Sequence, residues 1–111
     1  MYDDQQQDLT ATFAALSDPT RRAIVARLAK GEASVNELMK PFSFSQPTIS
    51  KHLRVLEQAG IVEGGRDAQR RPRRLRPLAL KIVDDWLKPF RQEWESRFDN
   101  LEGHLTNSKE K

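Results

Sequence analysis

The stretch that decides the fold is SVNELMKPFSFSQPTISKHLRVLEQAG, residues 34–60, because it contains two helical patterns separated by a short connection. The first pattern opens with Ser34 and has Glu37 three residues later, which is the spacing of a capping box. The second pattern has Ser45 available as a cap before its first turn and Gly60 as a terminator. The stretch therefore predicts two short helices joined by a tight turn.

The second of these helices, over 45–59, separates an apolar face from a cationic one. Its apolar stripe consists of Ile49, Leu53 and Leu56. The opposite face is polar and basic, and carries Pro47, Ser50, Lys51, Arg54 and Gln58. Together with the shorter helix over 34–40 it makes a helix-turn-helix pattern over 34–59. An exposed helix face of this chemistry suits the DNA major groove, where base edges display a distinguishing hydrogen-bond pattern.

Two further helices are predicted before this pair. Leu9, Phe13 and Leu16 are spaced four and three residues apart, which gives one apolar helical face. The next helix has Asp18 as its cap and Gly31 just past its end. These helices are expected to supply the core beneath the helix-turn-helix.

A basic segment follows the pair and predicts a β-hairpin, or wing, over residues 61–77. Residues 67–71 fit the turn, and residues 73–76 fit a returning edge strand with Leu75 facing the core and Arg74 facing solvent. The arginines expected to reach DNA phosphates are Arg70, Arg71 and Arg74. Arg66 and Arg76 lie nearer the base of the hairpin and are expected to be more structural.

The positive charge of the chain is concentrated in this region. The whole sequence of 111 residues has a net charge of +3. Residues 51–76 contain eight basic and three acidic side chains, a balance of +5, whereas the segments before and after it each have a balance of −1. Such a concentration indicates a polyanionic partner, most commonly a nucleic acid.

A long amphipathic helix is predicted over residues 80–105. Its apolar positions recur every three or four residues and are rich in aromatic side chains, and Pro89 predicts a kink or break near Lys88. The stripe is longer than the small core requires, so we expect a second copy of the chain to cover it. The predicted interface residues are Leu9, Phe13, Trp86, Phe90, Trp94, Phe98 and Leu101. The polar end, residues 106–111, is predicted to be disordered.

The segment from Phe13 to Val62 resembles the ArsR-type winged-helix transcriptional regulators, most specifically in LSDPTRRAIVARL and SQPTISKHLRVLEQAGIV. The resemblance implies a mainly α fold with a small β-hairpin, a winged helix-turn-helix of five or six helices in one domain over 1–111, which dimerises through its terminal helices. It also implies a homodimeric repressor that reads a palindromic operator in double-stranded DNA. The DNA-facing positions implied by the resemblance are Ser45, Gln46, Thr48, Ser50 and His52, to which helical geometry adds Lys51 and Arg54. Helical phase alone places His52 near the buried edge, so a half-buried ring is expected.

The chain departs from the family's metal sensors, because it contains no cysteine. Ser34 and Asn36 occupy the positions of the family's Cys-x-Cys pair, and neither offers a thiolate to a soft metal. The last helix offers carboxylates and only one histidine, His104. We therefore expect no metal site and no cofactor, and the inducing signal stays open.

Other classes of function are less compatible with the sequence. There is no nucleophile–base pairing or glycine-rich phosphate loop, so the chain is not expected to be an enzyme. A winged helix used for protein–protein contact remains an alternative, as does a derepressor that responds to a ligand or metal. With no apolar run of membrane-spanning length and an acidic, polar start, the chain is expected in the cytoplasm, associated with the nucleoid.

Overall fold

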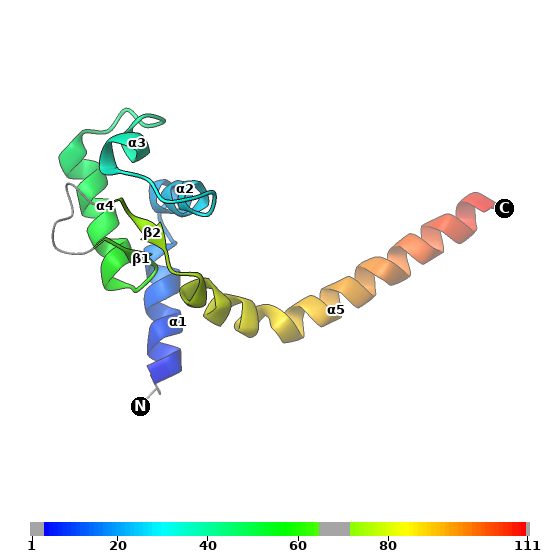
Figure 1. The fold of residues 1–111 in the computed structure, drawn as a ribbon. Coiled ribbons are helices and arrows are strands. Elements are labelled where there is room, and N and C mark those ends of the chain that lie inside the picture. The colour runs from blue at the N-terminus through cyan, green and yellow to red at the C-terminus, as the bar shows by residue number, and fades with distance from the viewer. Residues whose placement is uncertain (1–3, 65–71, 111) are drawn as a thin grey trace.

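The computed structural model describes the backbone of residues 4–64 and 72–110, and the side chains of residues 8–64 and 72–102. Five helices and one two-stranded hairpin make up this part of the chain (Figure 1). In order they are α1 (Asp4–Ala15), α2 (Pro19–Leu28), α3 (Val35–Met39), α4 (Gln46–Gln58), β1 (Val62–Glu63), β2 (Arg74–Leu75) and α5 (Pro77–Glu110). The predicted mainly α fold with a small hairpin is confirmed.

The predicted helix caps are all present. The Asp18 side chain accepts a hydrogen bond from the backbone N–H of Arg21 at 3.0 Å and so caps α2. Ser34 and Glu37 form a complete capping box at the start of α3, each side chain accepting from the backbone N–H of the other. The Ser45 side chain caps α4 by accepting a hydrogen bond from the Thr48 backbone N–H. Each cap satisfies a backbone donor that the first helical turn leaves without a partner, which fixes where the helices begin.

Two consecutive arginines of α2 donate hydrogen bonds to carbonyl groups at the C-terminal end of α1. Arg21 donates through Nε to the carbonyl oxygen of Ala15 at 2.6 Å. Arg22 donates through Nη1 to the carbonyl oxygen of Leu16 at 2.8 Å. The last carbonyls of a helix have no partner within the helix, so these bonds tie the end of α1 to the start of α2.

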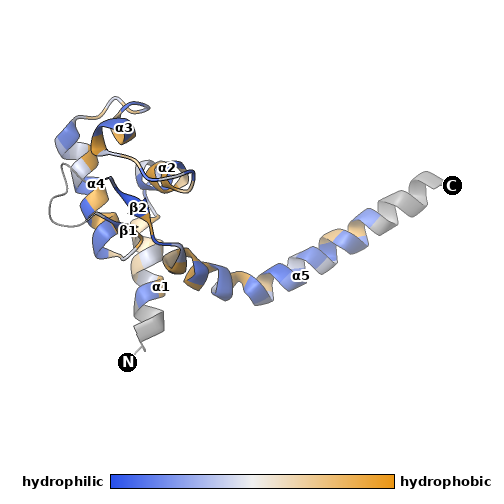
Figure 2. Cartoon of the chain, in the orientation of Figure 1, coloured by the Kyte–Doolittle hydropathy of each residue, from blue (hydrophilic) through white to orange (hydrophobic). Residues whose placement is uncertain are grey.

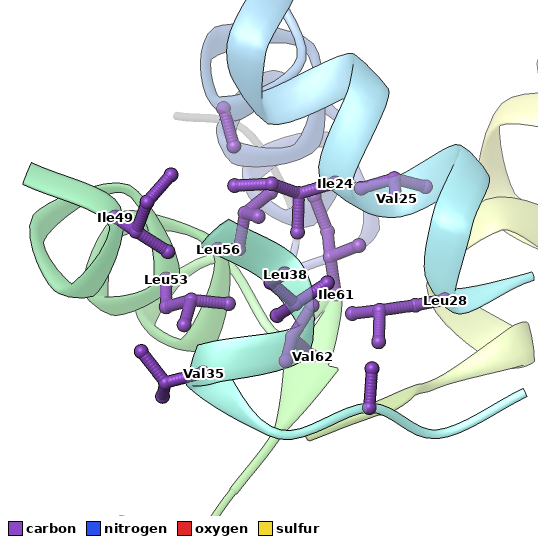
Figure 3. Packing of buried hydrophobic residues seen from close by; sticks show 12 residues of the cluster. Ile24, Val25, Leu28, Val35, Leu38, Ile49, Leu53, Leu56, Ile61 and Val62 are labelled. Atoms are coloured by element: carbon purple, nitrogen blue, oxygen red, sulfur yellow. The ribbon is translucent and has the colours of Figure 1, made fainter. Parts of the chain in front are cut away.

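The core lies where α2, α3, α4 and β1 meet. Figure 3 shows the buried side chains of these elements pointing toward one another. The fully buried large residues include Ile24, Leu38, Ile49, Leu56 and Ile61, each at 0% exposure. Because the α4 stripe faces this cluster, the opposite face of α4 is turned to solvent, as its amphipathic pattern predicts.

The hairpin is antiparallel, with Val62 paired to Leu75 and Glu63 to Arg74. On its other side Arg73 exchanges backbone hydrogen bonds with Ala33, at 2.8 and 3.1 Å. The returning strand was predicted to lie at an edge, but at Arg73 it runs between β1 and the segment before α3. The predicted turn, residues 67–71, lies outside the described residues.

The final helix, α5, is longer than predicted at both ends. It starts at Pro77 rather than at residue 80, and it includes residues 106–110, where the sequence predicts a disordered tail. The sequence 104–110 contains no proline, so every backbone N–H there can donate within the helix. Pro89 lies inside the helix without breaking it, and Figure 1 shows α5 changing direction in its yellow part.

Most of α5 extends away from the rest of the molecule (Figure 1). The radius of gyration is 18.8 Å, compared with about 13 Å for a compact domain of this length. Apolar patches recur along the described part of α5 (Figure 2). Among the described helices, we find no segment with the length and hydropathy of a membrane span.

Candidate nucleic-acid interface

The solvent face of α4 combines exposed and half-buried polar side chains. Gln46, Lys51 and Arg54 are exposed, whereas Thr48 and Ser50 are half-buried. The apolar stripe on the other side of the helix is at most 1% exposed. The core therefore holds α4 by one face and leaves a polar, cationic face free.

Ser45 and Thr48 form a small hydrogen-bonded unit at the first turn of α4. The Ser45 hydroxyl accepts from the Thr48 backbone N–H at 3.4 Å and lies 3.1 Å from the Thr48 hydroxyl. The two hydroxyls can each donate and accept, so they retain capacity for a further partner in solvent. The positive end of the helix dipole lies at the same turn, which favours an anionic group there.

His52 is half-buried, as helical phase predicts, with 20% of its side chain exposed. Its Nδ1 lies 3.4 Å from Arg21 Nη1 and 4.0 Å from the carboxylate of Asp18. A guanidinium only donates hydrogen bonds, so in the neutral ring Nδ1 is the acceptor and Nε2 carries the proton. The hydrogen bond from the Arg21 backbone N–H lowers the pKa of the Asp18 carboxyl. His52 thus connects α4 to the start of α2.

The described arginines of the hairpin have different surroundings. Arg74 is exposed over 65% of its side chain and lies 3.5 Å from a carboxylate oxygen of Glu63. Arg76 lies 3.3 Å from the other oxygen of that carboxylate. Arg73 is only 4% exposed and donates from Nε to Glu57 at 2.8 Å. Arg66, Arg70 and Arg71 lie outside the described residues.

Sequence reasoning missed the burial of Arg73. Side chains alternate along a strand, so the inward assignment of Leu75 implies that Arg73 points inward as well. An arginine is rarely buried without a partner, and the partner, Glu57, lies sixteen residues earlier on α4. The alternation of side chains along the returning strand could therefore have predicted that Arg73 is buried.

Six of the seven predicted interface residues are exposed in the single chain. Leu9 differs because it is only 9% exposed, which leaves little of it for another chain. Phe13 packs edge-to-face against Trp86 at 5.4 Å between ring centroids, and Trp86 lies 4.9 Å from Phe90. The exposed members are Phe13 (41%), Trp86 (45%), Phe90 (46%), Trp94 (39%), Phe98 (61%) and Leu101 (54%).

Metal-binding groups are not gathered at one place in the described part of the chain. No three His, Cys, Asp or Glu side chains there are arranged to hold a metal ion. The carboxylates of α5 instead pair with neighbouring cations: Asp84 with Arg91, and Asp85 with Lys81 and Lys88. Ser34, at one of the positions that metal sensors of the resembled family fill with cysteine, is occupied as a helix cap.

A helix-turn-helix followed by a basic hairpin defines the winged-helix class of regulatory proteins. Residues 18–64 match the bacterial regulatory protein arsR family. The chain belongs to this family of transcriptional regulators, as its similarity to curated members over most of their length shows.

Two curated relatives and one solved structure illustrate the similarity. The transcriptional repressor SdpR of Bacillus subtilis is 35% identical over 78 residues, which are 70% of this chain and 87% of the relative. The HTH-type transcriptional regulator Rv2034 of Mycobacterium tuberculosis is 46% identical over 76 residues, 68% of this chain and 71% of the relative. The crystal structure of the ArsR family transcriptional regulator RHA00566 superimposes with a TM-score of 0.72 at 35% identity, covering 86% of this chain and 96% of that one.

Proposed function

We propose that this chain is a homodimeric, sequence-specific DNA-binding repressor of its own or a neighbouring operon. In this proposal α4 enters the major groove of a palindromic site, and the arginine-rich wing contacts the backbone or the adjacent minor groove. The observation that carries the proposal is the two-sided character of α4, whose apolar stripe is buried and whose opposite face presents polar and basic side chains. The name of the relative SdpR supports repression as the outcome of binding.

The DNA-reading face is proposed to divide two tasks. Ser50 and Arg54 lie on the solvent side of α4, where side chains reach base edges in a major-groove complex. The proposal also assigns DNA contact to Ser45, Gln46, Thr48, Lys51 and His52. Arg74, and with it Arg70 and Arg71, is assigned to phosphates, which determine affinity rather than sequence preference.

The dimer is proposed from the exposed aromatic stripe of α5. Phe90, Trp94 and Phe98 have more than a third of their surface in solvent, although they lie on one face of a helix. Aromatic side chains of this size are the usual anchors of protein interfaces. A second copy of the chain, packed on this stripe, would bury it. The resulting dimer presents two α4 helices, one for each half of a palindromic site.

The test is a footprint of the purified protein on the DNA upstream of its gene, compared with Ser50→Ala and Arg54→Ala variants. We expect protection of two half-sites whose centres lie about 34–36 Å apart. Each variant is expected to relax the base preference by about 1–3 kcal/mol per lost contact. Gln92→Ala, exposed on α5 and away from α4, serves as the control.

Two results would count against the proposal. If the protein protects none of the promoter fragments tested, sequence-specific DNA binding is contradicted and a protein-binding winged helix is favoured. Protection that appears or disappears with zinc or a chelator contradicts the expectation that the chain has no metal site, and favours a metal-responsive derepressor.

A further inference from the structure

The ion pair between Arg73 and Glu57 joins the hairpin to the recognition helix α4. Arg73 Nε donates to Glu57 Oε1 at 2.8 Å, and the side chains are 5% and 29% exposed. Glu57 lies in the last turn of α4, one helical turn beyond the buried Leu53. The pair is largely removed from solvent, so its partners attract each other more strongly than surface charges do.

Gly64 is required for this contact. A Cβ atom built at Gly64 would overlap the side chain of Arg73, and would also lie 3.0 Å from Glu57 Oε1. The backbone of Gly64 therefore lies directly against the ion pair. A methyl group at this position cannot be added unless Arg73 or the backbone moves.

The neighbouring residue, Arg74, points the opposite way. Its side chain is 65% exposed, whereas that of Arg73 is 5% exposed. This alternation follows from the two-residue repeat of a strand, so whatever fixes Arg73 inward also fixes Arg74 outward. Arg73 is additionally bonded through its backbone to Ala33, which ties the strand to the segment before α3.

We propose that Arg73 is a positioning residue. Its ion pair with Glu57, against which the backbone of Gly64 packs, holds the hairpin in a fixed position relative to α4. In that position Arg74 contacts DNA phosphates while α4 occupies the major groove. This proposal rests on the proposed DNA-binding function. It separates the arginines of the wing into one that orients the strand and others that contact the polyanion.

A direct role of Arg73 on DNA makes the opposite prediction for Glu57. If Arg73 acted only through its charge, replacing Glu57 by Gln would remove a competing negative charge and tighten DNA binding. If Arg73 positions Arg74, the same substitution loosens the strand and weakens binding although the protein becomes more positive. The sign of the Glu57→Gln effect therefore distinguishes the two roles.

The experiment measures affinity for a duplex of about 30 base pairs, roughly three turns, as a function of salt. A random sequence suffices because phosphate contacts do not depend on sequence. We expect Arg74→Ala to weaken binding by about three- to tenfold and to lower the salt slope by about one unit. Glu57→Gln and Gly64→Ala are expected to cause a similar loss, and Gly64→Ala does so without any change in charge.

Additivity and a control complete the test. Because Glu57→Gln acts through Arg74, combining it with Arg74→Ala is expected to give no further loss. Glu32→Gln removes one exposed negative charge outside the hairpin and is expected to leave binding unchanged or slightly tighter. Far-UV circular dichroism of each variant establishes that the helices remain folded.

The outcomes separate this inference from the function on which it rests. If the wild-type chain binds the duplex while Glu57→Gln and Gly64→Ala bind as tightly or more tightly, the positioning role is wrong and DNA binding stands. Additive losses in the double variant also contradict it. If the wild-type chain does not bind duplex DNA at all, the proposed function fails, and this inference fails with it.

Discussion

The helices α4 and α5 carry similar apolar stripes but bury them very differently. The stripe of α4, Ile49, Leu53 and Leu56, is at most 1% exposed. On α5, the exposed fraction is 39–61% at the apolar residues Trp86, Phe90, Trp94, Phe98 and Leu101. A three- or four-residue repeat of apolar side chains therefore predicts that a face is covered, but it does not say whether the cover comes from the same chain.

The largest expected effect on stability comes from shortening a side chain in the buried apolar stripe of α4. Leu53→Ala should lower the free energy of unfolding by about 2–5 kcal/mol, because it leaves a cavity in a packed core. Chemical denaturation followed by circular dichroism measures this loss. In contrast, Leu101→Ala on α5 should lower stability only to the extent that the chain is dimeric, so its effect should depend on protein concentration.

The contrast between α4 and α5 would be contradicted if the effect of Leu101→Ala did not depend on protein concentration. A loss of similar size for Leu101→Ala at every concentration would mean that the chain itself covers the α5 stripe.

A second effect concerns the dimer that the α5 stripe is proposed to form. Trp94→Ala should weaken dimerisation by about 2 kcal/mol or more, roughly thirtyfold in Kd, because a large aromatic anchor is lost. Sedimentation equilibrium measures the dissociation constant. Gln92→Ala, exposed on the same helix but off the stripe, should leave it unchanged. Equal effects of the two substitutions on the dissociation constant would show that the α5 stripe is not part of the dimer interface.

The start of α4 allows a smaller and more local test. Ser45→Ala removes the side chain that accepts from the Thr48 backbone N–H, and should cost about 1 kcal/mol of stability. Ser43→Ala, exposed in the connection before the helix, is the matched control. Thermal melts without DNA compare them, and identical melting temperatures would show that the cap adds no stability.

The weakest effect is expected on the solvent side of α5, where Lys81 and Lys88 lower the pKa of Asp85 below its usual value of 3.8. A carboxylate with a lowered folded pKa stabilises the protein above its unfolded pKa, and this contribution disappears as the pH falls through the folded value. Wild type should therefore exceed Asp85→Asn in stability at neutral pH, and the difference should shrink as the pH falls below the usual value of 3.8 toward the lowered folded pKa. Thermal melts across this range measure it, and a constant difference would contradict the assignment.

Much of the helical architecture could be predicted because its determinants are local. The caps at Asp18, Ser34 and Ser45 depend on residues within three positions of each other, and all three are confirmed. The buried stripe of α4 follows from periodicity alone. The half-buried state of His52 also followed from helical phase, although its contacts with Arg21 and Asp18 did not.

The rest depends on contacts between distant parts of the chain. The pairing of Arg73 with Glu57, and its backbone bonds to Ala33, join residues that periodicity does not relate. For Pro89 the sequence predicted a kink or a break without deciding between them, and α5 continues through this residue. The DNA contacts of α4 and the wing, and the partner of α5, stay predictions.

The long projection of α5 also affects how the protein behaves in the laboratory. The chain measures 63 × 39 × 20 Å along its principal axes, far from a sphere. An elongated molecule diffuses more slowly than a globular protein of equal mass, so gel filtration calibrated with globular standards will overestimate its mass. A monomer of 12.8 kDa will then elute too early and resemble a larger species. Oligomeric state is therefore best measured by a method that reports mass independently of shape, such as light scattering.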